Sequence, residues 1–125
     1  MTGSAQDPLT EKIIGCAIEV HRRLGPGLLE SIYESALAIE LEHCGLKFER
    51  QVQLPITYRD RPIGDLRMDM VVDKSVILEL KSVERMDPIF EAQLLTYLRL
   101  SGIKTGLLIN FNSRLLHQGI KRLVL

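Results

Sequence analysis

The hydrophobic pattern changes from a helical to a strand-like period near Phe48, and this change most constrains the fold. Before it, apolar residues recur at three- and four-residue steps from Leu9 to Leu24 and again from about Leu28 to Cys44. This spacing predicts two amphipathic helices. Gly25-Pro26-Gly27 separates them, and Gly45 ends the second. The first part of the chain is therefore expected to be a helical pair.

After Phe48 the pattern is that of a sheet interrupted by a helix over residues 88–101, which Asp87-Pro88 starts and Gly102 ends. The turns predict strands over Phe48–Tyr58, Ile63–Val72, Val76–Lys81, Thr105–Phe111 and Leu115–Val124. We expect Gly119 to form a bulge in the last strand. The order α-α-β-β-β-α-β-β predicts an α/β fold in which helices flank a mixed sheet. The helix over 88–101 would form a right-handed crossover between parallel strands.

Length and composition indicate one globular domain. In this chain of 125 residues we expect residues 1–8 to be a flexible leader and residues 9–125 to form the domain. The 16 Lys plus Arg balance 16 Asp plus Glu, which excludes a protein that coats nucleic acid with bulk positive charge. The sequence shows no signal peptide and no apolar run of the ~20 residues that a membrane span needs. Cys16 and Cys44 form no CxxC pair, so we expect a cytoplasmic protein with two buried thiols.

Three polar residues, Asp69, Glu79 and Lys81, interrupt strands that are otherwise apolar. Glu79 and Lys81 are two residues apart and therefore lie on one face of their strand. A three-residue turn at 73–75 would place Asp69 directly opposite Glu79, whereas a two-residue turn at 73–74 would place the two carboxylates on opposite faces. We favour the three-residue turn, which predicts that the three polar side chains converge.

Converging Asp, Glu and Lys side chains are suited to metal-assisted hydrolysis of phosphodiester bonds. Carboxylates about 5 Å apart on neighbouring strands repel unless a cation joins them, and Mg²⁺ prefers such oxygen ligands. Lys81 would then hold the attacking water or stabilise negative charge that develops on phosphorus. The alternative is that Glu79-Leu80-Lys81 belongs to a solvated strand face, on which alternating charge is common.

Other polar residues bear on the same chemistry. Glu30 heads the second helix, where it would reach a metal as a third acid or be a surface acid favoured by the helix dipole. Gln93 and Tyr97 lie four residues apart on one face of the helix over 88–101, where they would contact a phosphate or orient the lysine. The alternative for this pair is a core tyrosine and a solvated glutamine.

Motifs along most of the chain resemble those of a known family. Gly27-Leu28-Leu29-Glu30-Ser31-Ile32-Tyr33 matches GxxExxY, and the segments LPITYRDRPIG, RMDMVV, LELKSVE and GIKRLVL follow in order. Over about residues 9–125 the chain resembles the GxxExxY protein family, small prokaryotic proteins of the PD-(D/E)XK nuclease superfamily. The resemblance implies a restriction-endonuclease-like α-β-β-β-α-β core, here with an extra N-terminal helix and an extra C-terminal strand.

The resemblance also implies roles for the polar residues. Asp69 and Glu79 would be the motif acids that bind Mg²⁺ or Mn²⁺. The carbonyl of Leu80 and the carboxylate of Glu30 would be further ligands, and Lys81 would be the catalytic lysine.

Gln93 and Tyr97 resemble the substrate-binding QxxxY element of the recombination-exonuclease branch. His21 is either the motif histidine that some branches use or a core or surface histidine. Met68 stands where the superfamily motif has proline, a variation that keeps the acid.

The resemblance implies a metal-dependent nuclease that hydrolyses DNA phosphodiester bonds with a metal-activated water. The alternative is a catalytically silent nuclease-fold module that binds nucleic acid or a partner protein. Because the chain shows no evident module for gripping DNA, a homodimer would supply the missing surface.

Overall fold

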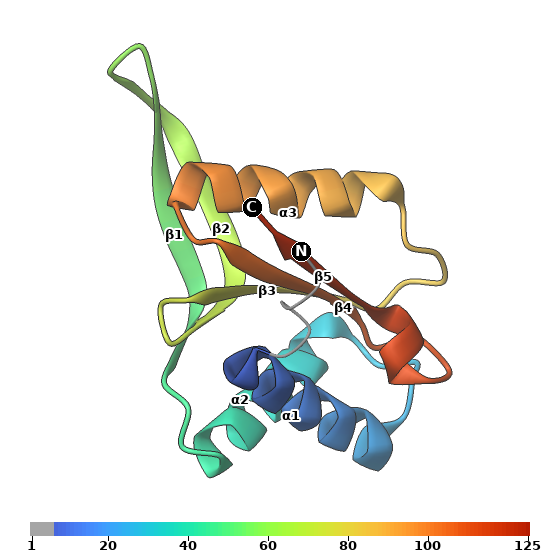
Figure 1. The fold of residues 1–125 in the computed structure, drawn as a ribbon. Coiled ribbons are helices and arrows are strands. Elements are labelled where there is room, and N and C mark those ends of the chain that lie inside the picture. Colours follow the sequence, from blue (N-terminus) through green and yellow to red (C-terminus); the bar gives the residue numbers. More distant parts are fainter. Residues whose placement is uncertain (1–6) are drawn as a thin grey trace.

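The computed structural model describes residues 7–125, which form three α-helices and a five-stranded sheet (Figure 1). The elements are α1 (Pro8–Leu24), α2 (Glu30–His43), β1 (Phe48–Tyr58), β2 (Arg61–Val72), β3 (Val76–Lys81), α3 (Pro88–Ser101), β4 (Thr105–Asn110), the 3₁₀ helix η2 (Leu116–Gly119) and β5 (Ile120–Val124). Of the expected leader, residues 1–6 lie outside the described part, while Asp7 and Pro8 already form the start of α1. Within residues 7–125, no helix has the length and apolarity to cross a bilayer.

The sheet has the strand order β1-β2-β3-β4-β5. Neighbouring strands are antiparallel except β3 and β4, which run parallel and are connected through α3. From α2 to β4 the elements follow the order α-β-β-β-α-β, while α1 precedes and β5 follows this core. The expected α/β fold with a mixed sheet and a restriction-endonuclease-like core is therefore confirmed.

The sheet separates two apolar layers, with α1 and α2 on one face and α3 on the other (Figure 1). The larger layer includes Ile13, Cys16, Tyr33, Leu37, Leu41, Met70, Leu78, Leu80 and Phe111. The smaller layer, beneath α3, comprises Met68, Val71, Ile77, Leu94, Tyr97, Leu98 and Leu108. Because helices cover both faces of β3 and β4, these strands are buried over nearly their whole length. A charged residue inside β3 is therefore exceptional.

The helix ends follow local sequence signals. The carboxylate of Asp7 accepts a hydrogen bond from the N–H of Leu9 at 3.0 Å, and that of Asp87 accepts one from the N–H of Ile89, also at 3.0 Å. A proline follows each of these caps at the first helical position. Gly102, with φ of 78°, ends α3 in the left-handed conformation. α3 therefore begins and ends where Asp87-Pro88 and Gly102 predict.

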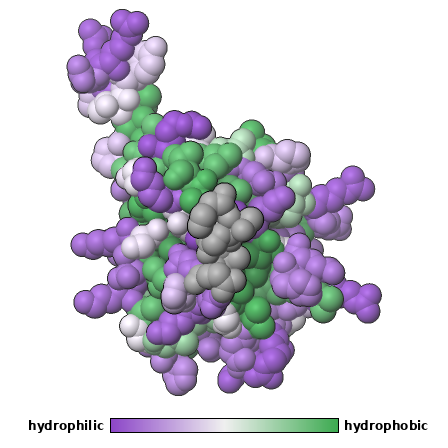
Figure 2. All heavy atoms as spheres, viewed as in Figure 1, coloured by the Kyte–Doolittle hydropathy of each residue, from purple (hydrophilic) through white to green (hydrophobic). Residues whose placement is uncertain are grey.

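β1 and β2 form a long hairpin whose tip projects beyond the rest of the sheet (Figure 1). We expected a turn over residues 59–62, but β2 already begins at Arg61. Arg59 and Asp60 alone reverse the chain, both with positive φ (49° and 63°). A two-residue turn of this conformation matches the twist of the flanking strands. Hydrophilic residues gather at the tip, which lies at the upper left of Figure 2.

The segment after β4 differs from the strand expected over Leu115–Val124. Leu116–Gly119 forms η2, and Ile120–Val124 pairs with β4. Gly119 is therefore not a strand bulge. It packs against the preceding loop, where an added Cβ would lie 2.6 Å from the carbonyl oxygen of Asn110. This close approach, which hydrophobic periodicity does not register, accounts for the difference.

The two cysteines meet where α1 contacts the end of α2. Cys16 is buried, but Cys44 is exposed at the C-terminal cap of α2, so the expectation of two buried thiols is wrong for Cys44. Both thiols are free, with their Sγ atoms 3.3 Å apart. Burial, followed by the neighbouring Cys44 thiol, raises the pKa of Cys16 to about 12. Cys16 is therefore a neutral thiol near pH 7.

Candidate active site

The turn between β2 and β3 decides whether Asp69 and Glu79 lie opposite each other. Met70 pairs with Leu78 in antiparallel register, so the turn comprises residues 73–75. The three-residue turn that we favoured is therefore confirmed. One step beyond the last ladder pair, this register brings Asp69 opposite Glu79.

Where the ladder between β2 and β3 stops, the two carboxylates link the strands. The N–H of Asp69 donates a hydrogen bond to Oε2 of Glu79 at 2.9 Å, and the N–H of Leu80 donates one to Oδ2 of Asp69 at 2.8 Å. Each carboxylate thus uses one oxygen to accept a main-chain donor from the opposite strand. Among the described residues, Oδ1 of Asp69 and Oε1 of Glu79 accept no hydrogen bond. One oxygen of each acid is therefore available to a ligand.

The acid pair is held away from water. Glu79 is 5% exposed and Asp69 is half-buried. Burial, followed by the neighbouring charge of Asp69, raises the pKa of Glu79 to about 7. Burial also raises the pKa of Asp69, against the effect of the hydrogen bond from Leu80. Two such acids bind a proton or a cation more readily than separate, solvated ones. The donor set, two carboxylates with an oxygen available on each, fits a hard divalent cation such as Mg²⁺.

Lys81 ends β3 on the same face as Glu79. Its Nζ lies 4.4 Å from the centroid of the Phe90 ring, near the start of α3. The lysine is half-buried, and its charge opposes the burial-driven rise in the pKa of both Asp69 and Glu79. Within residues 7–125 it forms no ion pair. Its ammonium group therefore stands near the acids and is free to contact a further anion.

A pocket of about 290 Å³ opens beside Asp69, lined by Glu30, Ser31, Glu34, Gln51, Arg67, Asp69 and Leu80. The structure thus brings Glu30, Asp69 and Leu80 to one pocket. Glu79 does not line it, and the described residues contain no group of three or more His, Cys, Asp or Glu side chains placed to hold a metal together. Asp69 and Glu79 therefore form a pair. Of the two, only Asp69 lines this pocket, together with Glu30.

From α3, Tyr97 approaches the acid pair. It is 8% exposed and belongs to the apolar layer beneath α3. Burial raises the pKa of its hydroxyl, and the charges of Glu79 and Asp69 add to the effect. Gln93, one helical turn earlier, is exposed. Tyr97 is therefore both a core residue and a neighbour of the acids, whereas Gln93 lies in solvent.

His21 lies apart from the acids. Its Nε2 is 2.7 Å from the carbonyl oxygen of Ser113, and it lines another pocket together with Arg114 and His117. The structure therefore favours the core or surface reading of this histidine.

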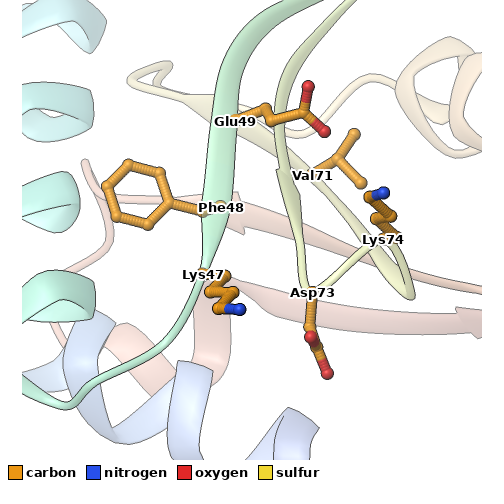
Figure 3. Close-up of a pocket in the computed structure, with 6 residues that line it drawn as sticks. All are labelled: Lys47, Phe48, Glu49, Val71, Asp73 and Lys74. Carbon is orange, nitrogen blue, oxygen red and sulfur yellow. The ribbon is translucent and has the colours of Figure 1, made fainter.

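A further pocket, of about 330 Å³, lies at the turn end of β2 (Figure 3). It is lined by Lys47, Phe48, Glu49, Val71, Asp73 and Lys74. None of the site residues predicted from the sequence is among them.

The loop before α2 is tied down on both sides, which positions Glu30. The hydroxyl of Tyr33 donates to the carbonyl of Gly25 at 2.5 Å and accepts from the N–H of Leu28 at 3.1 Å. The hydroxyl of Ser82, just after β3, donates to the carbonyl of Leu28 at 2.5 Å. The tyrosine of the GxxExxY motif therefore has a structural task, since it holds the chain from which the motif glutamate projects.

A second buried acid, Glu34, is missing from the sequence-based site. It is 8% exposed, and its carboxylate accepts from Nε of Arg50 at 2.9 Å and from Nε2 of Gln51 at 2.6 Å. Gln51 has φ of 51° and lies at a gap in the β1–β2 pairing, across from Asp69. The signal that would have found Glu34 is its place one helical turn after Glu30, on the same face of α2.

The fold and the site define a class of protein, with a mixed α/β sheet whose central strands carry an acid pair and a lysine at one end. A family model described as the PD-(D/E)XK nuclease superfamily matches residues 7–123, and the chain belongs to this superfamily. No curated protein and no solved structure matches the chain. Membership agrees with the resemblance noted in the sequence, while the narrower likeness to GxxExxY proteins stays a prediction.

Proposed function

We propose that this protein is a metal-dependent nuclease that hydrolyses DNA phosphodiester bonds. The observation that carries the proposal is the pair of Asp69, half-buried, and Glu79, buried, at the end of the β2–β3 ladder, with Lys81 on the same face of β3 as Glu79. Membership of a nuclease superfamily supports the reaction class. The metal and the DNA substrate rest on the chemistry of these three residues.

Asp69 and Glu79 would hold Mg²⁺ or Mn²⁺, with the carbonyl of Leu80 and the carboxylate of Glu30 as further ligands. When bound, the ion supplies Lewis acidity, which lowers the pKa of a water and neutralises charge on the phosphate. Because the pKa of Glu79 is raised to about 7, protons compete with the ion, and we expect metal affinity to increase with pH through this range.

Lys81 would donate a hydrogen bond to the attacking water or to a phosphate oxygen. Its positive charge would stabilise the negative charge that develops on phosphorus, an effect that is strongest in a partly buried site. Contact with the Phe90 ring limits the positions of the ammonium group. Tyr97, beside the acids, would orient the lysine or contact the phosphate, and Gln93 would contact the substrate farther out on the same helix face.

The alternative is a catalytically silent module that binds nucleic acid or a partner protein. The presence of Asp69, Glu79 and Lys81 together favours hydrolysis, since binding alone does not require this set. The proposal includes a cytoplasmic location with nucleic acid as the partner. Light scattering would show whether two copies associate to form a larger DNA surface.

The test is cleavage of single-stranded, duplex and branched DNA in Mg²⁺ or Mn²⁺. We expect Lys81→Ala and Asp69→Asn each to reduce the cleavage rate by about 10²–10³-fold, since the first removes a cation that stabilises charge on phosphorus and the second removes the charge of a proposed metal ligand. Lys12→Ala, which removes an exposed cation from α1, is the matched control and should cleave like the wild type. All variants are purified identically.

Equal cleavage by the wild type and both site variants would mean that the activity comes from elsewhere, and the proposal would be wrong. A wild type that binds DNA and metal but cleaves no substrate would favour the silent module.

A further inference from the structure

We propose that Arg67 and Gln53, on the solvent face of the β1–β2 hairpin, bind the sugar-phosphate backbone of a nucleic-acid strand that enters the pocket beside Asp69. This inference rests on the proposed function for the identity of the ligand. It assigns a surface that binds nucleic acid to the described part of the chain itself.

The position of Arg67 connects the hairpin to the acid pair. Arg67 lies two residues before Asp69 on β2, and alternate residues of a strand share a face. Both residues line the same pocket. The strand register pairs Arg67 with Gln53 of β1, and both of these side chains are exposed. A nucleic-acid strand that reaches Asp69 along the hairpin therefore passes Arg67 and Gln53.

The guanidinium of Arg67 is not committed to an acid of the described part of the protein. Arg50 of β1 is paired with the buried Glu34, whereas Arg67 forms no ion pair among residues 7–125. Its charge nevertheless acts on the site, because it opposes the burial-driven rise in the pKa of Glu79. An exposed, unpaired guanidinium presents two parallel N–H donors that match the geometry of phosphate oxygens.

The two faces of the hairpin differ in a way that suits this task. Val52, Leu54 and Leu66 pack against the apolar layer beneath α3, while the alternate residues Gln53 and Arg67 face solvent. Amide and guanidinium groups are donors that bind phosphates and sugars, and such contacts position a nucleic acid without reading its sequence. The ligand class is therefore the backbone of DNA, bound independently of its bases.

The length of the hairpin extends the same surface. From Arg67 back to its first residue, Arg61, β2 spans about 20 Å at the usual rise per residue. Arg59 and Arg61 lie at the exposed tip and carry positive charge. Backbone phosphates along such a length would meet Arg67 beside the pocket and Arg59 and Arg61 at the tip, and would pass the exposed acid Asp65 between them.

The experiment measures binding separately from cleavage. Fluorescence anisotropy follows labelled single-stranded and duplex DNA in EDTA, and again with Ca²⁺, over a range of NaCl concentrations. We expect Arg67→Ala to weaken binding about fivefold and to reduce the slope of log K against log salt by about 0.7–0.9, the value for one phosphate contact. Arg67→Lys should restore the slope but only part of the affinity, because lysine lacks the two-pronged geometry.

The remaining variants test the paired residue and the background. Gln53→Ala should weaken binding about threefold without changing the slope, since it removes a neutral donor. Lys12→Ala controls for the loss of any surface cation and should leave affinity and slope unchanged. Arg67→Glu should weaken binding more than Arg67→Ala, and circular dichroism checks that each variant is folded.

The inference is overturned if Arg67→Ala binds DNA like Lys12→Ala. It is also overturned if the wild type binds no DNA in either EDTA or Ca²⁺. Failure of the nuclease proposal looks different. An inactive protein whose DNA binding still depends on Arg67 would contradict the nuclease proposal and support the binding surface. Cleavage by a protein in which Arg67→Ala changes neither the DNA affinity nor its salt dependence would support the nuclease proposal and contradict the binding surface.

Discussion

Two glutamates in this protein are buried to nearly the same extent but lie in opposite electrostatic surroundings. Glu34 is 8% exposed and Glu79 is 5% exposed. Glu34 accepts hydrogen bonds from a guanidinium and an amide, whereas Glu79 accepts one from a main-chain N–H and lies next to the charge of Asp69. The protein therefore pairs one buried carboxylate with a cation of its own and places the other beside a second acid. Burial alone does not separate the two cases, but the partners of each carboxylate do.

The largest expected effect that separates the two glutamates is on cleavage. Glu79→Gln should lower the cleavage rate by about 10²–10³-fold, because it removes the charge of a proposed metal ligand. It should leave the free energy of unfolding unchanged or higher, because it relieves repulsion from Asp69. Cleavage assays in Mg²⁺ and urea denaturation in EDTA measure the two quantities. A Glu79→Gln protein that keeps wild-type activity would remove the contrast between the glutamates.

The next effect is a pH dependence that belongs to Glu79. Its pKa in the folded protein is about 7 against the usual 4.5, so the folded state holds a proton that the unfolded state has already lost between these values. The free energy of unfolding should therefore fall as pH rises from about 4.5 to about 7, by up to about 3 kcal/mol, and then level off. Urea denaturation in EDTA at about pH 5 and about pH 8 measures this, and the difference between wild type and Glu79→Gln isolates Glu79 from other acids. Identical pH profiles for the two proteins would show that Glu79 does not titrate in this range.

The smallest expected effect is the loss of stability when Glu34 is replaced. Glu34→Gln should lower the free energy of unfolding by about 1–2 kcal/mol, because it removes a charged acceptor from Arg50 and Gln51. The value is modest because the Arg50 side chain is 42% exposed and water screens the pair. Urea denaturation provides the measurement. The cleavage rate should change less than tenfold, and a loss as large as that of Glu79→Gln would place Glu34 in the reaction.

The fold was predictable from the sequence wherever capping, proline, glycine or turn residues decide where a helix or strand begins and ends. Asp87-Pro88 and Gly102 bracket α3, and the bounds of β1 and β3 follow from the same kind of signal. Prediction was wrong where hydrophobic spacing was the only guide. The approach of Gly119 to Asn110 replaces the first part of an expected strand with η2. The position of Cys44 at a helix cap exposes a thiol that the apolar spacing indicated as buried.

The candidate site was predictable only in part. Asp69 and Glu79 stand out in the sequence because they are acids within apolar strands, and the turn at 73–75 was enough to place them opposite each other. Glu34 does not stand out, because an acid on an amphipathic helix looks the same in the sequence whether it is solvated or buried. What makes it structural is its contact with Arg50 and Gln51, in another element, and only the folded chain shows this contact.

The turn between β2 and β3 has a consequence for the order of folding. Asp69, Glu79 and Lys81 lie within one hairpin, residues 69–81, so closing a short loop brings them together at a low cost in chain entropy. The parallel pairing of β3 with β4 instead joins Lys81 to Asn110 across the whole of α3, and contacts of such sequence separation form slowly. The three candidate site residues are thus gathered by a local hairpin contact, and the later-forming elements provide the burial that raises the pKa of Glu79.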